Sequence, residues 1–387
     1  MLHESPITPR RESEDLTSIV YGTDEHPTRV IESFGDLDME YASIRKGCVV
    51  FDAPHLGSLT ISGDERLGFL NNMLTAKLDD LTPGSSIGSF WLNRQGRIDA
   101  DLRLVQQDSS MTVRLDRHLA NASASSLEGY VFAEDVEIKD TSAETHWISL
   151  HGPTAVRVIE SIADDGFTPP EPNGNTTVTI SGVEVVLDRE DLTGEVGYWL
   201  CVPVGDAAKV YNAIMDSGEA DPSLKLRETG WLGINTARIE AGNPLFNVDF
   251  GPDNLPAESG IMDRRVHLAK GCYLGQEVVA RMHARGVRKQ SVVALRLDSQ
   301  RVTMEQQQVL QPMSGAHVHV RGQDTETPVG AVTSSTISPM LGAIPICFAM
   351  LKDAHTAPGT ELSVQAEGQH APCVVADTLV FWSHAQG

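Results

Sequence analysis

Two hydrophobic periods alternate along the first 245 residues of the chain. Short runs rich in Val, Ile and aromatic residues are bounded by turn residues, which favours β-strands. Other segments place apolar residues three or four positions apart, which favours amphipathic helices. Strands are predicted at 49–51, 59–61, 89–92, 100–104, 112–115, 147–150, 178–180, 184–187 and 198–202. Helices are predicted at 64–74, 153–162, 207–215 and 230–242, the first with Asp64 as its N-cap. The mixture predicts an α+β fold.

The pattern changes near residue 290. From there on apolar and polar residues alternate between turn signals, so 290–387 is predicted to be all β. The short glutamine run at 306–308 is predicted to be a loop. Residues 1–28 are polar and proline-containing, and we expect them to be loosely ordered. The predicted organisation is therefore a loose N-terminus, a mixed region at 29–289 and a β domain at 290–387.

Composition narrows the class of protein. The 387 residues are 41% hydrophobic and 21% charged, which is typical of a soluble globular chain, and no run approaches 18 apolar residues. The N-terminus lacks the apolar core of a secretory signal, and the five cysteines show no CxxC spacing. We therefore expect a cytoplasmic protein without a membrane partner, a disulfide framework or a metal site. The net charge of −23 argues against general nucleic-acid binding.

One cysteine lies in a segment suited to thiol chemistry. Cys272 lies between Gly271 and Gly275, close to Lys270, and just before a predicted helix that begins at Gln276. A helix N-terminus and a nearby cation both favour the thiolate. The alternative is a buried, inert cysteine beside a turn.

Two further patterns carry charge. Asp99 and Asp101 are two positions apart on a predicted strand, so they share a face, either as reactive carboxylates or as an exposed pair. The run from Arg281 to Lys289 is the one clear basic cluster in this acidic chain. It suits the carboxylates of a ligand, a partner protein or RNA, or a solvated helix face.

Several motifs together resemble the glycine-cleavage T-protein family. They occur in the family's order over roughly residues 45–380, and the shared order is more specific than any single motif. They are Phe51-Asp52-Ala53-Pro54-His55-Leu56-Gly57, the segment Asn93 to Leu102, Thr193-Gly194-Glu195-Val196-Gly197-Tyr198, Arg238-Ile239-Glu240-Ala241-Gly242, and Val332-Thr333-Ser334 followed by Pro358-Gly359-Thr360. The resemblance implies two interleaved α+β domains and a C-terminal β-barrel around a central folate channel.

The segment Lys270 to Glu277 resembles a narrower branch. Its Lys-Gly-Cys-Tyr-Leu-Gly-Gln-Glu sequence is similar to the signature of YgfZ-type folate-binding proteins, whose relatives assist the maturation of iron–sulfur proteins. The resemblance implies a tetrahydrofolate-binding accessory factor with iron–sulfur client proteins and a link to tRNA modification. The T-protein-like alternative is an aminomethyltransferase. A folate sensor or scaffold is a third possibility, and the residues leave open whether the protein is an enzyme.

The resemblance also assigns site residues. Glu195 is expected to bind the pterin, because one carboxylate can accept both the ring N–H and the neighbouring exocyclic amine; the alternative is a solvated turn glutamate. Cys272 and Asp101 are the expected catalytic residues; the family pattern is Asp-Asp-Leu, and only Asp101 aligns without a gap. Asn93, Arg238, Lys270 and Tyr273 are expected to bind tetrahydrofolate or its one-carbon derivative.

Overall fold

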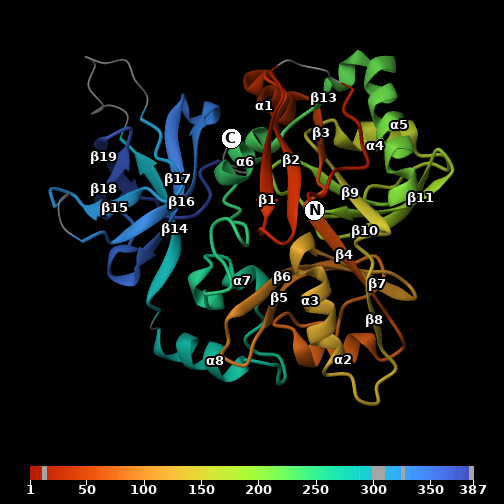
Figure 1. Cartoon of the computed structure of the whole chain (residues 1–387), viewed down its shortest axis with the longest axis horizontal. Coiled ribbons are helices and arrows are strands. Elements are labelled where there is room, and N and C mark those ends of the chain that lie inside the picture. The colour runs from red at the N-terminus through yellow and green to blue at the C-terminus, as the bar shows by residue number, and fades with distance from the viewer. Residues whose placement is uncertain (11–14, 287, 299–309, 324–326, 383–387) are drawn as a thin grey trace. The chain divides into compact units, whose positions relative to one another are not determined.

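The computed structural model describes residues 1–10, 15–286, 288–298, 310–323 and 327–382, so the predicted loop at 306–308 lies outside the described residues. The chain forms two compact units, which are described one at a time below (Figure 1). Unit 1 comprises Met1–Trp91, Ala100–Ile234 and Ala269–Leu274, and unit 2 comprises Leu92–Asp99, Asn235–Leu268 and Gly275–Gly387. Within the described ranges, no helix is long and apolar enough to cross a membrane.

Unit 1 contains a six-stranded sheet. Its order is β10 (Asn175–Ile180), β11 (Val183–Arg189), β12 (Gly197–Pro203), β9 (Thr145–His151), β3 (Cys48–Asp52) and β13 (Leu226–Glu228). Helices α4 (Ala155–Ile162) and α5 (Ala207–Ala220) pack on one face, where Val158 and Ile214 join Leu150 and Leu200 in a single apolar core. Along β9 and β12 every second residue belongs to this core, so the intervening residues face the other way.

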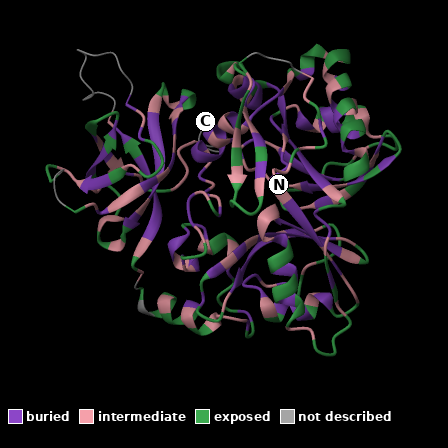
Figure 2. Ribbon diagram, in the orientation of Figure 1, coloured by how far each residue is buried: buried purple, intermediate pink, exposed green. Residues whose placement is uncertain are grey.

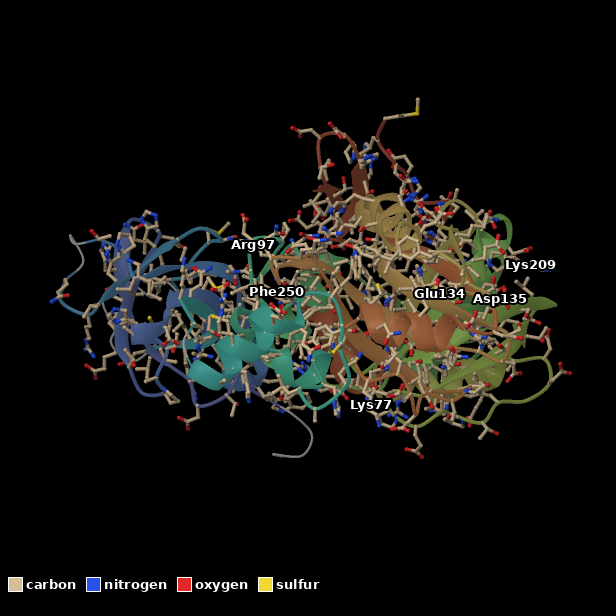
Figure 3. All side chains as sticks on the ribbon, turned by 90° about the horizontal axis from the view of Figure 1, so that it is seen from below. Lys77, Arg97, Glu134, Asp135, Lys209 and Phe250 are labelled. Carbon is tan, nitrogen blue, oxygen red and sulfur yellow. The ribbon has the colours of Figure 1, made fainter. Side chains whose placement is uncertain are left out.

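Unit 1 also contains a five-stranded sheet. Its order is β5 (Ser86–Leu92), β6 (Ile98–Gln106), β7 (Ser110–Asp116), β4 (Leu56–Ser62) and β8 (Glu137–Asp140). Helices α2 (Arg66–Met73) and α3 (Arg117–Glu128) pack against it through Leu70 and Leu127. The prediction that Asp64 caps α2 is wrong, because Glu65 occupies the N-cap position and makes no side-chain cap. Asp135, labelled in Figure 3, instead accepts the Asp64 N–H with its carboxylate.

The predicted loose N-terminus is wrong for the residues that the structure describes there. Strands β1 (Thr17–Gly22) and β2 (Pro27–Ser33) form an antiparallel pair, and α1 (Leu37–Lys46) follows. Ile7 is buried in the core of the six-stranded sheet. Arg10 donates to the Asn212 side chain and bonds to Glu219 on α5. The apolar anchor and the ion pairs hold the segment in place despite its polar composition.

Unit 2 is built on a closed six-stranded barrel. Its order is β14 (Gln290–Leu297), β17 (Ile344–Lys352), β16 (Gly330–Ser338), β15 (His317–Val320), β18 (Glu361–Ala366) and β19 (Gln369–Val375), with β14 also pairing with β19. The first barrel strand begins at the residue where the sequence pattern changes. Figure 2 shows buried positions following the strands, with exposed positions along α5 and α8 (Gln276–Arg285).

Shorter elements complete the two units. Helix α6 (Trp231–Glu240) runs from the end of unit 1 into unit 2. Unit 2 also contains α7 (Met262–Arg265). The 3-10 helices are η1 (Val204–Asp206), η2 (Pro222–Leu224), η3 (Pro256–Glu258), η4 (Pro339–Leu341) and η5 (Asp353–His355).

Candidate functional site

Glu195 lies in the turn that joins β11 to β12. The backbone N–H of Gly197 donates to the Asp191 carboxylate at 3.0 Å, and Gly194 takes a positive φ of 80°, so the turn is tightly held. Glu195 is only 3% exposed. Its Oε1 accepts from Nη1 of Arg45 at 3.1 Å, and the same nitrogen donates to the Thr193 carbonyl at 2.8 Å. Glu195 is therefore a buried, paired carboxylate, and the alternative of a solvated turn glutamate is wrong.

Arg45 is the buried partner of Glu195, and the sequence did not reveal it. It lies on the last turn of α1, where its guanidinium also donates to the Tyr41 hydroxyl at 3.1 Å and lies 5.3 Å from the centre of that ring. Its side chain is 5% exposed. Glu195 lies 150 residues later in the chain, so no local pattern links the two.

Lys270 is anchored to the end of α2. Its ammonium donates to the carbonyls of Asn71 (2.6 Å), Leu74 (2.8 Å) and Ala76 (2.5 Å), which accounts for all three of its N–H groups. The nitrogen lies 5.3 Å from the centre of the Tyr273 ring. Burial lowers the pKa of Lys270 to about 8 and raises the pKa of Tyr273 to about 12. Lys270 thus has a clear structural role, and its predicted folate contact stays a prediction.

Cys272 differs from the other cysteines of the chain. It is exposed, whereas Cys48, Cys201, Cys347 and Cys373 are buried. Burial raises the pKa of Cys201 to about 11 and that of Cys373 to about 12. The buried position that the alternative gave to Cys272 is therefore wrong. Its catalytic role stays a prediction, as does the effect of Lys270 on its thiolate.

The predicted carboxylate pair lies on β6, as expected. Along this strand Ala100 and Leu102 belong to the apolar core, so Asp99 and Asp101 share the opposite face, and both are half-buried. Asp99, in unit 2, accepts from the Asn93 side-chain amide at 2.9 Å. Burial raises its pKa, and this hydrogen bond opposes the rise. Asp101 belongs to unit 1. Its expected catalytic role stays a prediction.

Asn93 shapes the hairpin between β5 and β6. Its side-chain oxygen accepts the backbone N–H groups of Gln95 at 3.0 Å and Arg97 at 3.1 Å. The tip also carries the exposed Arg97, labelled in Figure 3, which pairs with Asp253 at 3.6 Å. Asn93 therefore holds the turn, and its folate contact stays a prediction.

Arg238 lies at the centre of a buried network in unit 2. It has no exposed surface, pairs with Asp249, and donates to the Asn235 side chain at 2.7 Å. Asp249 in turn accepts from the hydroxyls of Thr333 and Ser334 on the barrel. Burial lowers the pKa of Arg238. This network ties α6 to β16, and the predicted folate contact of Arg238 stays a prediction.

A second buried ion network lies in unit 1 and was not predicted. Arg103 on β6 makes two hydrogen bonds to Asp188 on β11, at 2.8 and 2.9 Å. Arg114 on β7 pairs with Asp188 at 3.5 Å and with Glu190. The two arginines link the five-stranded sheet to the six-stranded sheet. Each alternates with apolar residues on its strand, which gives only a weak sequence signal for a buried charge.

The basic run is partly paired. Arg288 bonds to Asp353 at 2.6 Å, and Arg281 is exposed on α8. Lys289 is exposed as well, so the described part of the run combines one ion pair with two exposed cations, and none of the predicted partners is selected.

Two family models match the chain. The GCVT N-terminal domain covers residues 24–270, and the glycine cleavage T-protein C-terminal barrel domain covers residues 291–381. The chain belongs to the glycine-cleavage T-protein family. The predicted T-protein resemblance and the α+β fold with a C-terminal barrel are therefore confirmed. The YgfZ-type branch and the central folate channel stay predictions.

Curated relatives of this T-protein family member are named aminomethyltransferase. The protein from Synechococcus sp. (strain RCC307) is 27% identical over 344 residues, which cover 88% of this chain and 89% of the relative. That from Geobacillus kaustophilus (strain HTA426) is 28% identical over 355 residues, 91% of each chain. The crystal structure of glycine cleavage system aminomethyltransferase T from Bartonella henselae has a TM-score of 0.79 at 19% identity and 95% coverage of each chain. At that identity the structural likeness shows the fold alone.

Proposed function

We propose that this T-protein family member binds tetrahydrofolate and transfers a one-carbon unit in an aminomethyltransferase-type reaction. The buried Glu195–Arg45 pair carries the proposal, because it sets an ionised acceptor inside the folded chain. The names of the curated relatives support the same reaction type.

The chemistry of Glu195 fits a pterin. The pterin ring presents an N–H and an exocyclic amine side by side, and a carboxylate accepts both in a planar arrangement. A carboxylate offers roughly four acceptor positions, so one carboxylate can accept from an arginine and from a ligand together. Arg45 places an opposite charge 3.1 Å from this buried carboxylate, which offsets part of the cost of its burial.

Asp101 is the proposed proton-transfer group. Bound tetrahydrofolate supplies the amine nitrogens that accept the one-carbon unit. In the proposed reaction the methylene carbon of an aminomethylated lipoyl carrier forms bonds to two amine nitrogens of tetrahydrofolate, and its bonds to the lipoyl sulfur and to the amino nitrogen break. The two amine protons leave on the lipoyl thiol and on ammonia, so methylene-tetrahydrofolate forms. Asp101 is half-buried on the face of β6 that turns away from the apolar core. We expect its carboxylate to exchange a proton with the reacting folate amine at this partly desolvated position.

An ammonia-release assay tests this proposal. With an aminomethylated lipoyl carrier and tetrahydrofolate, the wild-type protein should release ammonia, and Asp101→Asn should lose about 100-fold or more in rate. Asp99→Asn is the matched control, since Asp99 shares the strand and the face, and its carboxylate accepts from the Asn93 side-chain amide. Wild-type protein that binds tetrahydrofolate but releases no ammonia would rule out the transferase activity.

The exposed Cys272 favours a second candidate function. In this candidate the chain is a tetrahydrofolate-binding accessory factor for iron–sulfur proteins, including those that thiolate tRNA, and Cys272 is the working thiol. A strain lacking the protein should recover iron–sulfur enzyme activity with the wild-type gene but not with Cys272→Ala at equal protein abundance. Full recovery with Cys272→Ala would exclude a working role for the thiol. If neither activity accompanies folate binding, a sensor or scaffold role is left.

A further inference from the structure

Strand β1 has one edge that no other strand covers. It pairs with β2 in a two-stranded sheet, and among the residues that the structure describes no strand pairs with its other side. All residues of β1 are exposed or half-buried (Figure 2), and Val20 is 67% exposed. A ligand can therefore approach this strand from solvent.

The register of the pair shows which backbone groups face that edge. Arg29 on β2 donates its backbone N–H to the His3 carbonyl at 3.0 Å, so at Arg29 the backbone of β2 turns away from β1. Hydrogen-bonded and non-hydrogen-bonded residues alternate along an antiparallel pair. Val20 lies opposite Arg29, so Val20 directs its N–H and C=O away from β2, and so does Ser18, two positions earlier. These two residues form the outer edge of β1, called the open edge here.

The opposite edge of the pair is closed, and the open edge is not. On the closed side His3 donates its N–H to the Pro27 carbonyl at 2.8 Å and accepts from Arg29. Strand β1 reads Thr-Ser-Ile-Val-Tyr-Gly and contains neither a charge nor a proline. Edge strands of soluble proteins are usually blocked by lysine, proline or a covering segment. An accessible edge without these devices is a template for the addition of a strand.

Side-chain contacts hold β1 in its extended conformation. The Tyr21 hydroxyl donates to the Asp116 carboxylate at 2.9 Å, and the Tyr21 ring lies 5.2 Å from the His55 ring. Across the pair, the Arg29 guanidinium donates to the Ser18 hydroxyl at 3.2 Å. A two-stranded sheet is only marginally stable by itself, so these contacts fix the strand in place. The open edge is therefore preorganised, which lowers the entropic cost of adding a further strand.

Charges at the two ends of β1 select the kind of strand that fits. Asp15 lies just before β1, and Asp24 and Glu25 lie just after it, and all three are exposed. Arg29, the cation on the facing part of β2, is paired with Glu4 at 3.0 Å. A second copy of this chain, added antiparallel, would bring its Asp15 towards Asp24 and Glu25, and like charges oppose that pairing. An uncharged segment with basic residues at both ends fits these carboxylates instead.

We propose that the open edge of β1 binds an extended segment of a partner protein, which adds to the β1–β2 sheet as a third strand. The segment is uncharged and rich in β-branched residues, with lysine or arginine at both ends. Main-chain hydrogen bonds to Ser18 and Val20 supply the affinity, and the carboxylates beyond the strand ends set the preference for basic flanks. This interaction goes beyond the proposed transferase reaction and does not depend on folate binding.

Fluorescence anisotropy with two labelled synthetic peptides tests the proposal. Both peptides have a core of alternating threonine and valine; one carries lysines at both ends, and the other carries glutamates. The full-length protein should bind the lysine peptide saturably at micromolar to millimolar concentration, and the glutamate peptide about 10-fold more weakly. Amide hydrogen exchange of residues 16–22 should slow when the lysine peptide binds, because the outward N–H of Val20 gains a partner.

Two kinds of variant locate the binding. Val20→Pro removes the outward N–H and keeps the bonds between β1 and β2, because proline is tolerated where the N–H of an edge strand faces solvent. It should weaken binding of the lysine peptide about 10-fold and leave the ligand-free melting temperature unchanged. Val20→Thr is the matched control, since it keeps the N–H and a β-branched side chain and should bind within about twofold of the wild type. The double variant Asp24→Lys, Glu25→Lys leaves the strand untouched and should reverse the preference between the two peptides.

The outcomes decide the proposal either way. Preference for the lysine peptide that is lost in Val20→Pro and reversed in the double variant supports it. It is overturned if folded wild-type protein shows no saturable binding, if the double variant keeps the wild-type preference, or if exchange at residues 16–22 does not change. Self-association of the chain that Val20→Pro abolishes would identify a second copy as the occupant, and would overturn the proposal of a basic partner segment.

Discussion

Lys270 offers a sharp test of how the structure is held together. Lys270→Met removes the ammonium and keeps most of the aliphatic side chain. The three carbonyl acceptors of Asn71, Leu74 and Ala76 then lose their shared donor. Hydrogen bonds to a charged group contribute about 1.5–3 kcal/mol each, or roughly 4.5–9 kcal/mol for three, and the burial of the ammonium opposes that gain. We expect a net loss of about 3 kcal/mol and a melting temperature lower by roughly 5 °C.

The pH dependence of the same variant adds a second readout. The pKa of Lys270 is lowered from an ordinary 10.5 to about 8, so between these values the unfolded chain binds more protons than the folded one. Wild-type stability therefore rises with pH across this window, and the stability gap to Lys270→Met should widen from pH 7.5 to pH 9.5. Calorimetry at the two pH values measures it.

The control for Lys270→Met is Lys77→Met. Lys77 directly follows Ala76, one of the residues whose carbonyl accepts from Lys270. It is labelled in Figure 3 and pairs with Asp80 at the surface. Its loss should not change the melting temperature measurably. Equal effects of the two variants, or a gap that narrows with rising pH, would refute the reasoning about Lys270.

Three further predictions follow from the contacts. A water-soluble maleimide should label one thiol per native chain, none in Cys272→Ser, and all five in denatured wild-type protein; labelling of a second native thiol would contradict the burial of the other four. Arg45→Met should destabilise the fold by about 3 kcal/mol in urea unfolding, because Glu195 keeps a buried charge without this partner, and Arg45→Lys should restore part of the loss. Asp188→Asn should destabilise the fold by a similar amount, because Arg103 loses its buried partner. An unchanged midpoint of urea unfolding would refute the buried network.

Many strands could be predicted because their signals are local. The apolar runs before and after Asn93 indicated two strands, and the alternation that begins at β14 indicated an all-β region. The closure of that region into a barrel was implied only by the resemblance to the T-protein family. Helix α3 was missed because its core positions include Ala120 and Ala124, whose small side chains contrast little with their polar neighbours. The N-terminal strand pair was missed because its anchors, Ile7 and Arg10, act through residues far along the chain.

The candidate site could be predicted only where a motif carries it. The Thr-Gly-Glu turn singled out Glu195, and glycines singled out the segment around Cys272. The partner of Glu195 is Arg45, which comes into contact only through folding. The acceptors of Lys270 are backbone carbonyls, which leave no trace in the sequence.

Isothermal titration of tetrahydrofolate into wild-type protein and Glu195→Gln tests the central claim most directly. The account predicts saturable one-site binding to the wild type. It also predicts about 10- to 100-fold weaker binding to Glu195→Gln, because the substitution keeps the shape of the side chain but removes the charge-assisted hydrogen bonds to the pterin. Absence of saturable binding to folded wild-type protein, or equal affinity of the two proteins, would contradict the claim that Glu195 anchors a folate.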